Sequence, residues 1–467
     1  MRKIDKENLR VYNELYIAFS NLSDKYGIHS NIIGVFFHEI MIYLTNYNII
    51  KSDRVNYTSN ISFPFLNTDY CLNPKIIDYR YLVLKKKISF RLKIINFFFK
   101  NIFSLKKIKI EIDKSLIKIL SPFIVKNIFN YKFSTLKENK VYIRNNKEQI
   151  DILRKVLLNI INKYDINNKN IFIENFINYI SCFISEEPIK VNSDILLVGS
   201  NSSLFNRINS ANYLYSNKKV ISFAHGDVID FLSFDEPYFG YGEFSYCDYY
   251  ISFGSNSLTF ARYNKPLKGY NPKFYKINSK TISGLFCNKN IINLPITKEM
   301  KGLYIPTGFS QNQRYGPFRD MSDKEYIKWQ KEIFRLSLDI TYKAHPTSKI
   351  NFLNKKQKVS YFNLKECVNE YDYYIVDYIS TAIMIVCATN KPVIYFDLGL
   401  RNMKDEFLFD LKNRVHYYKI DFKQDIFFQL ENAILSYSDF TYSNDFIQKY
   451  SLSDNSMEKV ISNILES

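Results

Sequence analysis

The sequence is poor in glycine and proline and has no long apolar run. Its 467 residues include only 13 glycines and 12 prolines, which excludes collagen-like, Gly/Ser-linker and Pro-rich classes. The longest apolar runs, at 33–44 and 378–389, fall short of the ~20 residues that a membrane-spanning helix needs. Residues 1–10 are charged and lack the apolar core of a signal peptide. We therefore expect a cytosolic protein.

Several chemical signatures are also missing. The six cysteines lie far apart, without a Cys-x-x-Cys pair, which predicts reduced thiols rather than disulfides or a metal cluster. The chain has no Asp-x-Asp, no P-loop and no Gly-x-Gly-x-x-Gly motif. We therefore expect neither a metal site nor a cofactor, and any phosphate would be held by helix N-termini, histidine, lysine and hydroxyl groups.

Basic residues, by contrast, are in excess. The chain has 64 Lys and Arg against 46 Asp and Glu, a formal net charge of +18, which indicates an anionic partner such as nucleic acid, a membrane surface or an anionic substrate. Nine basic residues and no acidic one lie within 85–109, interleaved with Ile and Phe. This pattern favours an interfacial segment on an anionic membrane; a helix with one solvated face is the structural alternative. No nucleic-acid motif is present, so nucleic acid is not the expected partner.

The N-terminal region, 1–185, is expected to be mainly helical, and apolar spacing near three and four predicts helices at 9–22, 32–44 and 150–161. It contains no catalytic motif. From about 190 the pattern changes to short apolar runs that end in Gly, His, Ser, Pro or Asp.

These apolar runs form two series. The first comprises 195–198, 220–223, 249–253 and 281–282, and the second comprises 303–305, 340–343, 373–376 and 393–396. Helical stretches lie between some of them, the clearest at 323–338. Strands that alternate with helices predict parallel sheets. We therefore predict an α/β protein with two Rossmann-like domains, 186–295 and 296–467, that face each other across a cleft.

Polar residues follow the runs of the first series, where open parallel sheets bind ligands. His225 and Gly226 come directly after 220–223, which places an imidazole beside backbone that a ligand can approach closely. Acidic residues that follow are candidates for deprotonating a hydroxyl group; they are Asp235, Glu236, Glu243 and Asp248. A loop histidine and a solvated acidic loop are the structural alternatives.

The second series ends in a candidate phosphate site. Pro346 keeps His345 out of helical geometry, so His345 and Lys343 form a possible phosphate-binding pair at a strand end. Ser380 and Thr381 precede the apolar helix expected at 382–388, where free N–H groups and hydroxyls can hold a phosphate. Ordinary helix capping is the alternative.

Taken in order, His225-Gly226, His345-Pro346 and Ser380-Thr381 resemble motifs of the two-Rossmann (GT-B) transferases of bacterial surface-polysaccharide assembly. Related groups are the Kdo transferases, the sialyltransferases with an HP motif and the CDP-glycerol glycerophosphotransferase-like enzymes. The segment 243–254, with the pattern Glu-x4-Asp-x-Tyr-x-Ser-Phe-Gly, is similar to a family of surface-carbohydrate transferases, and 304–308 and 314–317 also fit that family.

The resemblance implies a metal-independent glycosyltransferase that moves a CMP-activated sugar (Kdo, sialic acid or a similar nonulosonic acid) onto a glycan or lipid-linked glycan. It also implies that the protein acts at the inner face of the bacterial cytoplasmic membrane. Donor binding would fall to His345, Lys343, Ser380, Thr381 and Gly226, and catalysis to His225 with Glu243, Asp235 or Glu236. A CDP-polyol phosphotransferase is the alternative, and a basic nucleic-acid-binding protein is a remote one.

Overall fold

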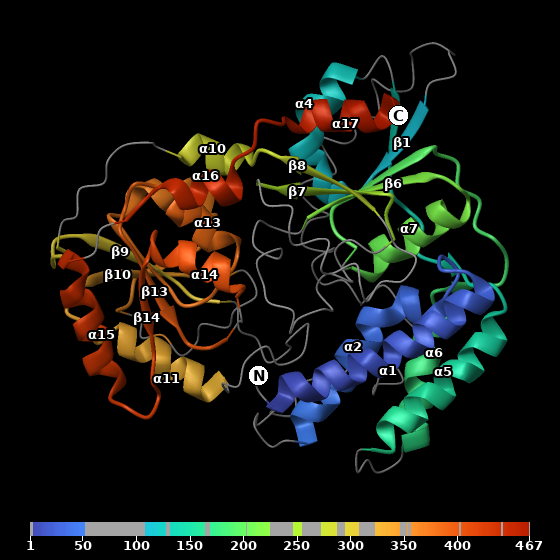
Figure 1. The fold of residues 1–467 in the computed structure, drawn as a ribbon, viewed down its shortest axis with the longest axis horizontal. Coiled ribbons are helices and arrows are strands. Elements are labelled where there is room, and N and C mark those ends of the chain that lie inside the picture. The colour runs from blue at the N-terminus through green and yellow to red at the C-terminus, as the bar shows by residue number, and fades with distance from the viewer. Residues whose placement is uncertain are drawn as a thin grey trace.

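The computed structural model describes residues 3–51, 108–127, 131–163, 169–201, 203–224, 246–254, 272–286, 295–307, 323–345, 353, 356–400, 403–439 and 442–466. These residues form two lobes, each built on a six-stranded parallel sheet (Figure 1). A short parallel pair, β3 (Val141–Tyr142) and β4 (Ile184–Ser185), lies outside both sheets.

The first sheet has the strand order β2-β1-β5-β6-β7-β8, and all neighbouring strands are parallel. Its strands are β1 (Ile108–Ile112), β2 (Tyr131–Thr135), β5 (Ile195–Val198), β6 (Lys219–Phe223), β7 (Tyr249–Phe253) and β8 (Lys273–Ile277). Every residue of β5 is buried, because helices cover both faces of a parallel sheet and leave no solvated side.

Side chains alternate between the two faces of this sheet. Leu196 and Val198 share a core with the N-terminal helices, whereas Ile195 and Leu197 pack in a second core with α4 (Ile117–Asn127) and α17 (Met457–Glu466). The first face is covered by α1 (Lys3–Tyr26), α2 (Ile32–Lys51), α5 (Asn146–Ile161), α6 (Lys169–Ser181) and α7 (Leu204–Tyr215). The C-terminal helix α17 thus closes the lobe in which the chain begins.

The second sheet has the order β11-β10-β9-β12-β13-β14, again all parallel. Its strands are β9 (Lys301–Ile305), β10 (Asp339–Lys343), β11 (Val359–Ser360), β12 (Tyr373–Val376), β13 (Val393–Asp397) and β14 (His416–Lys419). One face packs on α12 (Leu364–Cys367), α13 (Thr381–Cys387), α14 (Asp405–Lys412) and α16 (Asp445–Ser451), and the other on α11 (Asp323–Ile333) and α15 (Ile426–Leu435).

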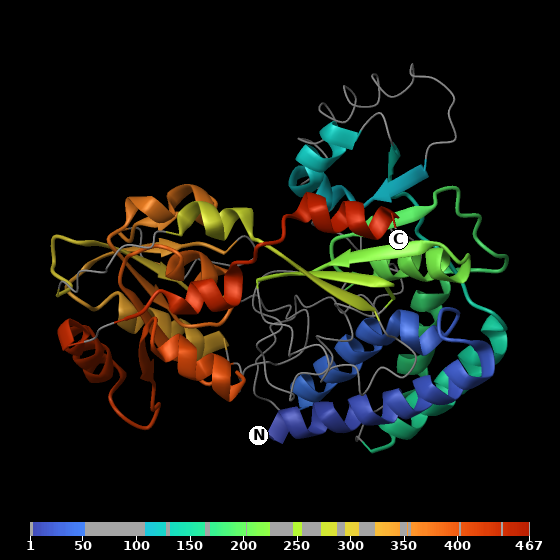
Figure 2. The ribbon, with the colours of Figure 1, turned by 45° about the horizontal axis from the view of Figure 1, so that its top comes forward.

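The two lobes meet where the first sheet ends. Helix α10 (Lys280–Leu285) follows β8 and packs against α13, the helix that follows β12. Gly254, at the end of β7, has φ +90°, and a Cβ there would lie 1.9 Å from the carbonyl oxygen of Tyr450 in α16. This position therefore needs glycine. In Figure 2, β7 and β8 point toward the second lobe.

Two Rossmann-like lobes with a returning C-terminal helix form a GT-B architecture, so the predicted fold class is confirmed. Two details of the sequence analysis are wrong or incomplete. Residues 281–282, expected in a strand, lie in α10, because the Ser279 hydroxyl caps a helix there by accepting from the Ile282 amide. The first sheet also takes β1 and β2 from the region expected to be mainly helical. None of the described helices is long and apolar enough to cross a membrane.

Candidate functional site

The second sheet has a topological switch point between β9 and β12. Strands β10 and β11 extend the sheet on one side of β9, whereas β12, β13 and β14 extend it on the other. In open α/β sheets, ligands bind outside the carboxyl ends of the strands at such a point. Here those ends are Thr307, which closely follows β9, and Asp377, which directly follows β12. The switch point therefore marks the candidate site.

Asp377 is fully buried and fixes the floor of this site. Its carboxylate accepts hydrogen bonds from Tyr304 Oη at 2.5 Å, Tyr326 Oη at 2.9 Å and Trp329 Nε1 at 2.9 Å. The backbone N–H of Thr307 also donates to Asp377, at 3.3 Å, and to Tyr326 Oη, at 2.9 Å. Asp377 thus ties the ends of β9 and β12 to α11.

Asp377 has a structural role rather than a reactive one. Burial raises the pKa of its carboxyl group, and the surrounding donors oppose that rise. Burial and the neighbouring carboxylate raise the pKa of Tyr304, so the phenol stays protonated and donates. A carboxylate that is saturated with donors in this way positions the site rather than reacting.

Ser380 and Thr381 lie at this edge, as the sequence indicated. Ser380 is the N-cap of α13, and its Oγ accepts from the Ala382 amide at 3.3 Å. Capping uses Oγ as an acceptor, so the Ser380 O–H is still able to donate. Both Ser380 and Thr381 are half-buried, whereas the helix behind them, 383–387, is buried.

His345 and Lys343 differ in exposure. His345, two residues beyond the end of β10, is exposed, whereas Lys343 is 9% exposed and its Nζ donates to the carbonyl of Ala344 at 2.9 Å. Burial lowers the pKa of Lys343. The register pairs Tyr342 with Tyr304, and Tyr304 with Ile375. His345 therefore follows the strand next to β9, on the β11 side of the switch point.

An exposed aromatic pair lies beyond the neighbouring edge strand. Tyr361 and Phe362 directly follow β11 and are 72% and 69% exposed. Because Lys343 pairs with Ser360, this pair leaves the sheet at the same edge as His345. Sequence analysis missed it, since two aromatics in a chain with 77 Tyr and Phe residues give no signal without the register.

Five of the predicted site residues lie outside the described part of the chain: the catalytic candidates His225, Asp235, Glu236 and Glu243, and Gly226, which was predicted to bind the donor. The fourth acidic candidate, Asp248, is described and has a structural role. Its Oδ2 accepts from the Val220 amide at 2.8 Å, and burial raises its pKa. Asp248 thus joins the start of β7 to β6.

The first sheet has its own switch point between β1 and β5. Asp113 occupies it: its Oδ2 accepts from Gly199 N at 3.2 Å and from Asn206 Nδ2 at 3.1 Å, and its Oδ1 accepts from Ser115 N at 3.1 Å. The turn after β1, Lys114–Leu116, is thereby held against the end of β5.

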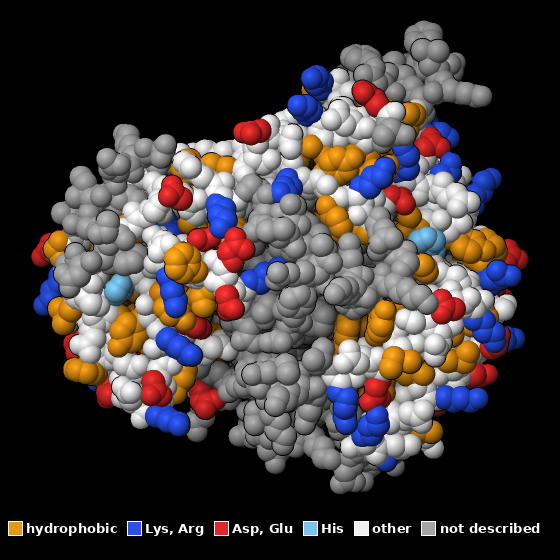
Figure 3. Space-filling view, viewed as in Figure 1, with side chains coloured by type: hydrophobic (Ala, Val, Ile, Leu, Met, Phe, Trp, Pro, Cys, Tyr) orange, Lys and Arg blue, Asp and Glu red, His pale blue; other side chains and the backbone are white. Residues whose placement is uncertain are grey.

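Charge is mixed on the face of the molecule that Figure 3 shows. In Figure 3, the Lys and Arg side chains of both lobes are interspersed with Asp and Glu. The basic segment 85–109 lies outside the described residues except for 108–109. Within the described ranges, no group of three or more His, Cys, Asp or Glu side chains is arranged to hold a metal ion.

No family model matches the sequence, and no curated protein matches it. Distant structural similarity links it to solved proteins. The UDP-GlcNAc 2-epimerase of Methanocaldococcus jannaschii is 12% identical with a TM-score of 0.39, covering 77% of this chain and 99% of that one. Spinosyn forosaminyltransferase SpnP is 9% identical with a TM-score of 0.37, covering 77% and 99%. The UDP-GlcNAc 2-epimerase of Neisseria meningitidis, solved with UDP-GlcNAc, is 12% identical with a TM-score of 0.35, covering 77% and 100%.

Proposed function

We propose that this protein is a glycosyltransferase that binds a nucleotide-activated sugar at the carboxyl edge of its second sheet. The observation that carries the proposal is a coincidence of position. The switch point between β9 and β12, chosen by topology alone, is where Ser380 and Thr381 lie, and His345 follows the strand next to it. The motif residues and the topology thus select the same edge.

In this proposal the donor phosphate lies against the Ser380 and Thr381 hydroxyls, with His345 beside it. Hydroxyl groups and an imidazole donate hydrogen bonds to phosphate oxygens, and such donors stabilise the charge that develops as the nucleotide leaves. Lys343 is the weaker candidate, because its buried Nζ already donates to a backbone carbonyl. The resemblance favours a CMP-linked donor, whose single phosphate needs less neutralisation than a diphosphate.

The acceptor side of the proposal rests on the resemblance. His225, or a carboxylate among Glu243, Asp235 and Glu236, removes the proton from an acceptor hydroxyl, and Gly226 lets the donor approach the backbone. The acceptor oxygen then bonds to the anomeric carbon, and the bond from that carbon to the phosphate oxygen breaks, so CMP leaves. The acceptor is a surface glycan or a lipid-linked glycan. The basic segment 85–109 brings the protein close to this acceptor by binding anionic lipid.

The test is CMP release by the purified protein from CMP-Kdo and CMP-sialic acid, with glycan acceptors, with and without EDTA. We expect release that EDTA leaves unchanged and that falls at least tenfold in the His345→Ala variant. The matched control is His416→Ala, which alters a half-buried histidine at β14. Absence of release from every cytidine donor refutes the proposal, and a product that carries a phosphodiester, detected by mass spectrometry, indicates polyol-phosphate transfer instead.

The membrane proposal is tested separately by flotation with lipid vesicles. We expect binding to vesicles that contain anionic lipid and weak binding to neutral ones. A variant with Lys85, Lys86 and Lys87 changed to Gln should float less. Equal binding to both lipid compositions would contradict the assignment of 85–109.

A further inference from the structure

Helix α4 is apolar on the side that packs on the first sheet and also on the side that faces outward. Seven of its eleven residues are apolar. Leu120, Phe123 and Ile124 are buried in the core that α4 shares with α17. The outer face of α4 carries Ile119, which is 45% exposed, and Val125, which is 71% exposed. Because a helix that is apolar all round is normally covered on every side, we expect this outer face to have an apolar partner.

The neighbouring helix in the same core has the usual arrangement. The exposed residues of α17 are Lys459, Asn463 and Glu466, all of them polar. Figure 2 shows α4 at the top of the first lobe, next to α17. Both helices cover the same face of the same sheet. The apolar outer face is therefore a property of α4 itself and does not follow from its place in the fold.

The unit that carries α4 is positively charged. Residues 108–135, which include β1, α4 and β2, contain five lysines and two acidic residues. Both carboxylates are engaged within the first lobe. Glu111 accepts from the Tyr213 hydroxyl at 2.6 Å, and Asp113 accepts from the Gly199 amide at 3.2 Å. The unit therefore offers its positive charge, rather than its negative charge, to a partner.

Exposed lysines lie close to the outer face of α4. Lys126 follows Val125 on the helix, and only 128–130 separate α4 from β2. Lys109 and Lys132 are register partners at the starts of β1 and β2. None of the three lysines forms an ion pair with a described residue. Like charges side by side on neighbouring strands are destabilising, and anionic groups bound between them would remove that repulsion.

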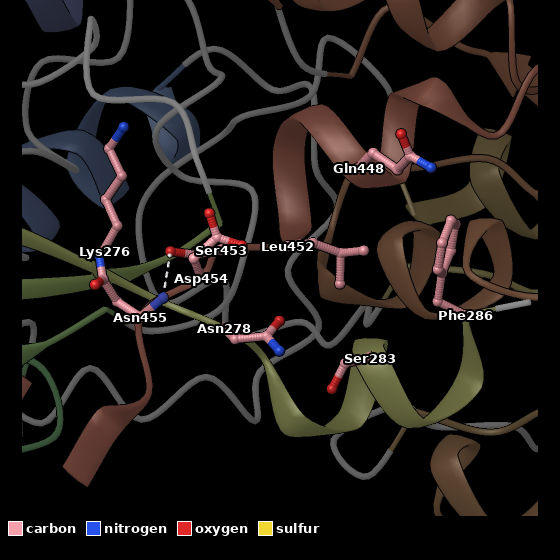
Figure 4. A pocket seen from close by; sticks show the side chains of 9 residues that line it. All are labelled: Lys276, Asn278, Ser283, Phe286, Gln448, Leu452, Ser453, Asp454 and Asn455. Carbon is pink, nitrogen blue, oxygen red and sulfur yellow. Dashed lines mark hydrogen bonds between the residues drawn. The ribbon is translucent and has the colours of Figure 1, made fainter. Parts of the chain in front are cut away.

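The cavity at the junction of the two lobes has a different character. It has a volume of 680 Å³, and its lining is mostly polar, with Lys276, Ser283 and Asp454 among the residues (Figure 4). Water satisfies polar groups of this kind, so the cavity does not indicate a particular partner. Exposed aliphatic side chains beside unpaired lysines do.

We propose that the outer face of α4 inserts shallowly into an anionic membrane. Aliphatic side chains such as Ile119 and Val125 enter the boundary between headgroups and acyl chains, while Lys126 binds headgroup phosphates. A nucleic acid would use the lysines but gain little from aliphatic side chains, because bases stack on aromatic rings. This inference rests on the proposed membrane association of 85–109, which runs directly into β1. It places the first lobe, the proposed acceptor side, against the membrane.

The first experiment introduces a tryptophan on α4 and measures its quenching by lipid. The native chain has one tryptophan, Trp329, which is fully buried and gives a constant background. The vesicles contain equal parts of phosphatidylglycerol and phosphatidylcholine with brominated acyl chains. We expect the fluorescence of Val125→Trp to shift to the blue and to be quenched. Ile171→Trp, at a 61% exposed position on α6, is the matched control and should show neither change.

The second experiment measures flotation of the full chain with unbrominated vesicles of the same headgroups. The double variant Ile119→Ser, Val125→Ser should bind at least tenfold more weakly, because two apolar side chains no longer enter the membrane. The control double variant is Ile17→Ser, Ile171→Ser, which removes two side chains of the same lobe that are 60% and 61% exposed. It should bind as the native chain does. Circular dichroism checks that each variant is folded.

The two experiments separate this proposal from the one on 85–109. If the native chain binds but Val125→Trp is not quenched, or if the α4 double variant floats as the native chain does, the role of α4 is overturned while 85–109 keeps its role. Absence of binding by the native chain contradicts both proposals. A native dimer that the α4 double variant converts to a monomer, with unchanged flotation, would identify a second copy of the chain as the partner and overturn the membrane proposal for α4.

Discussion

Asp377 organises the candidate site through hydrogen bonds that its buried carboxylate accepts. Four donors from β9, the residue after β9 and α11 converge on its two oxygen atoms. Removing an acceptor from such a network leaves buried donors unsatisfied, and that costs more than the mean value of a hydrogen bond.

We predict that Asp377→Asn lowers the free energy of unfolding by about 2–4 kcal/mol, because an amide N–H₂ would then face the Trp329 N–H, which cannot accept. Urea unfolding followed by circular dichroism measures this. Asp339→Asn, at a half-buried carboxylate paired with the exposed Lys358, should cost less than about 1 kcal/mol. Equal effects of the two variants would show that the Asp377 network does not hold the edge together.

His416 contributes to the free energy of unfolding in a way that depends on pH, and the sign of this dependence follows from the burial of its ring. Burial lowers the pKa of this half-buried imidazole, partly offset by a hydrogen bond with the Ala433 backbone. The folded state therefore favours the neutral ring. Its contribution to stability is present above the unfolded pKa of about 6.5 and is lost as the pH falls from there through the folded value.

We therefore predict that the His416→Gln variant gains stability relative to the native chain as the pH is lowered from 7 to 5. The free energies of unfolding of the variant and of the native chain, measured at several pH values, give this difference. Other groups that titrate equally in both proteins cancel in it. A difference that stays constant across that range would contradict the burial of a neutral His416.

At the scale of elements, a buried ion pair joins α2 to α7, the helix that packs on β5 and β6 of the first sheet. Arg207, in the first turn of α7, donates to Glu39 of α2 at 2.8 and 2.6 Å, to the Val35 carbonyl at 2.8 Å and to the Asn201 carbonyl at 2.7 Å. Arg207 is fully buried and Glu39 is 8% exposed, so neither charge has water as an alternative partner.

We predict that Glu39→Gln costs about 3–5 kcal/mol of stability, because it leaves the Arg207 charge buried without its counter-ion. The double variant Glu39→Leu, Arg207→Met should recover most of that loss. Asp151→Asn, which breaks the exposed pair with Arg154, serves as the control and should cost under about 1 kcal/mol. A Glu39→Gln variant as stable as the control would show that the pair does not anchor α2.

The exposed aromatic pair beside His345 has an expected role in donor binding. Stacking of a base on an aromatic ring contributes about 1–3 kcal/mol. We predict that Tyr361→Ser combined with Phe362→Ser raises the KM for the donor about tenfold while kcat changes little. Phe409→Ser, at a 67% exposed ring on α14, is the matched control. A loss confined to kcat, or no change in KM, would remove the pair from the donor site.

The elements that sequence predicted well are those whose signal is local. Continuous apolar runs predicted β5, β7 and β12 with their observed bounds, because central parallel strands are apolar on both faces. Strands β1 and β8 escaped prediction, since Ile-Lys-Ile-Glu-Ile and Lys-Phe-Tyr-Lys-Ile alternate and carry charge. They lie at or next to the edges of the sheet, where burial is partial.

The candidate site divides in the same way, into residues that a local pattern predicts and residues that only the folded chain brings together. Ser380 was predicted as an N-cap because capping depends on residues within one helical turn. The donors around Asp377 come from positions 48 to 73 residues away, so only the folded chain brings them together. The position of His345 relative to the switch point likewise depends on strand order, which no local pattern specifies.

For the whole molecule, we propose that the second lobe binds the nucleotide and that the first lobe does not. Both sheets have a switch point. At the first, Asp113 holds the turn that follows β1 against the end of β5, whereas the second is bordered by Ser380, Thr381 and the exposed His345. The sheet topology thus gives two candidate nucleotide sites, and the side chains favour the one in the second lobe.

The most direct measurement is a crystal structure of the full chain grown with CMP. We predict that the phosphate lies within hydrogen-bond distance of the Ser380 hydroxyl, beside Thr307 and His345, with the cytosine extending toward Tyr361. A CMP molecule bound at the carboxyl edge of the first sheet, with the edge between β9 and β12 left empty, would contradict it.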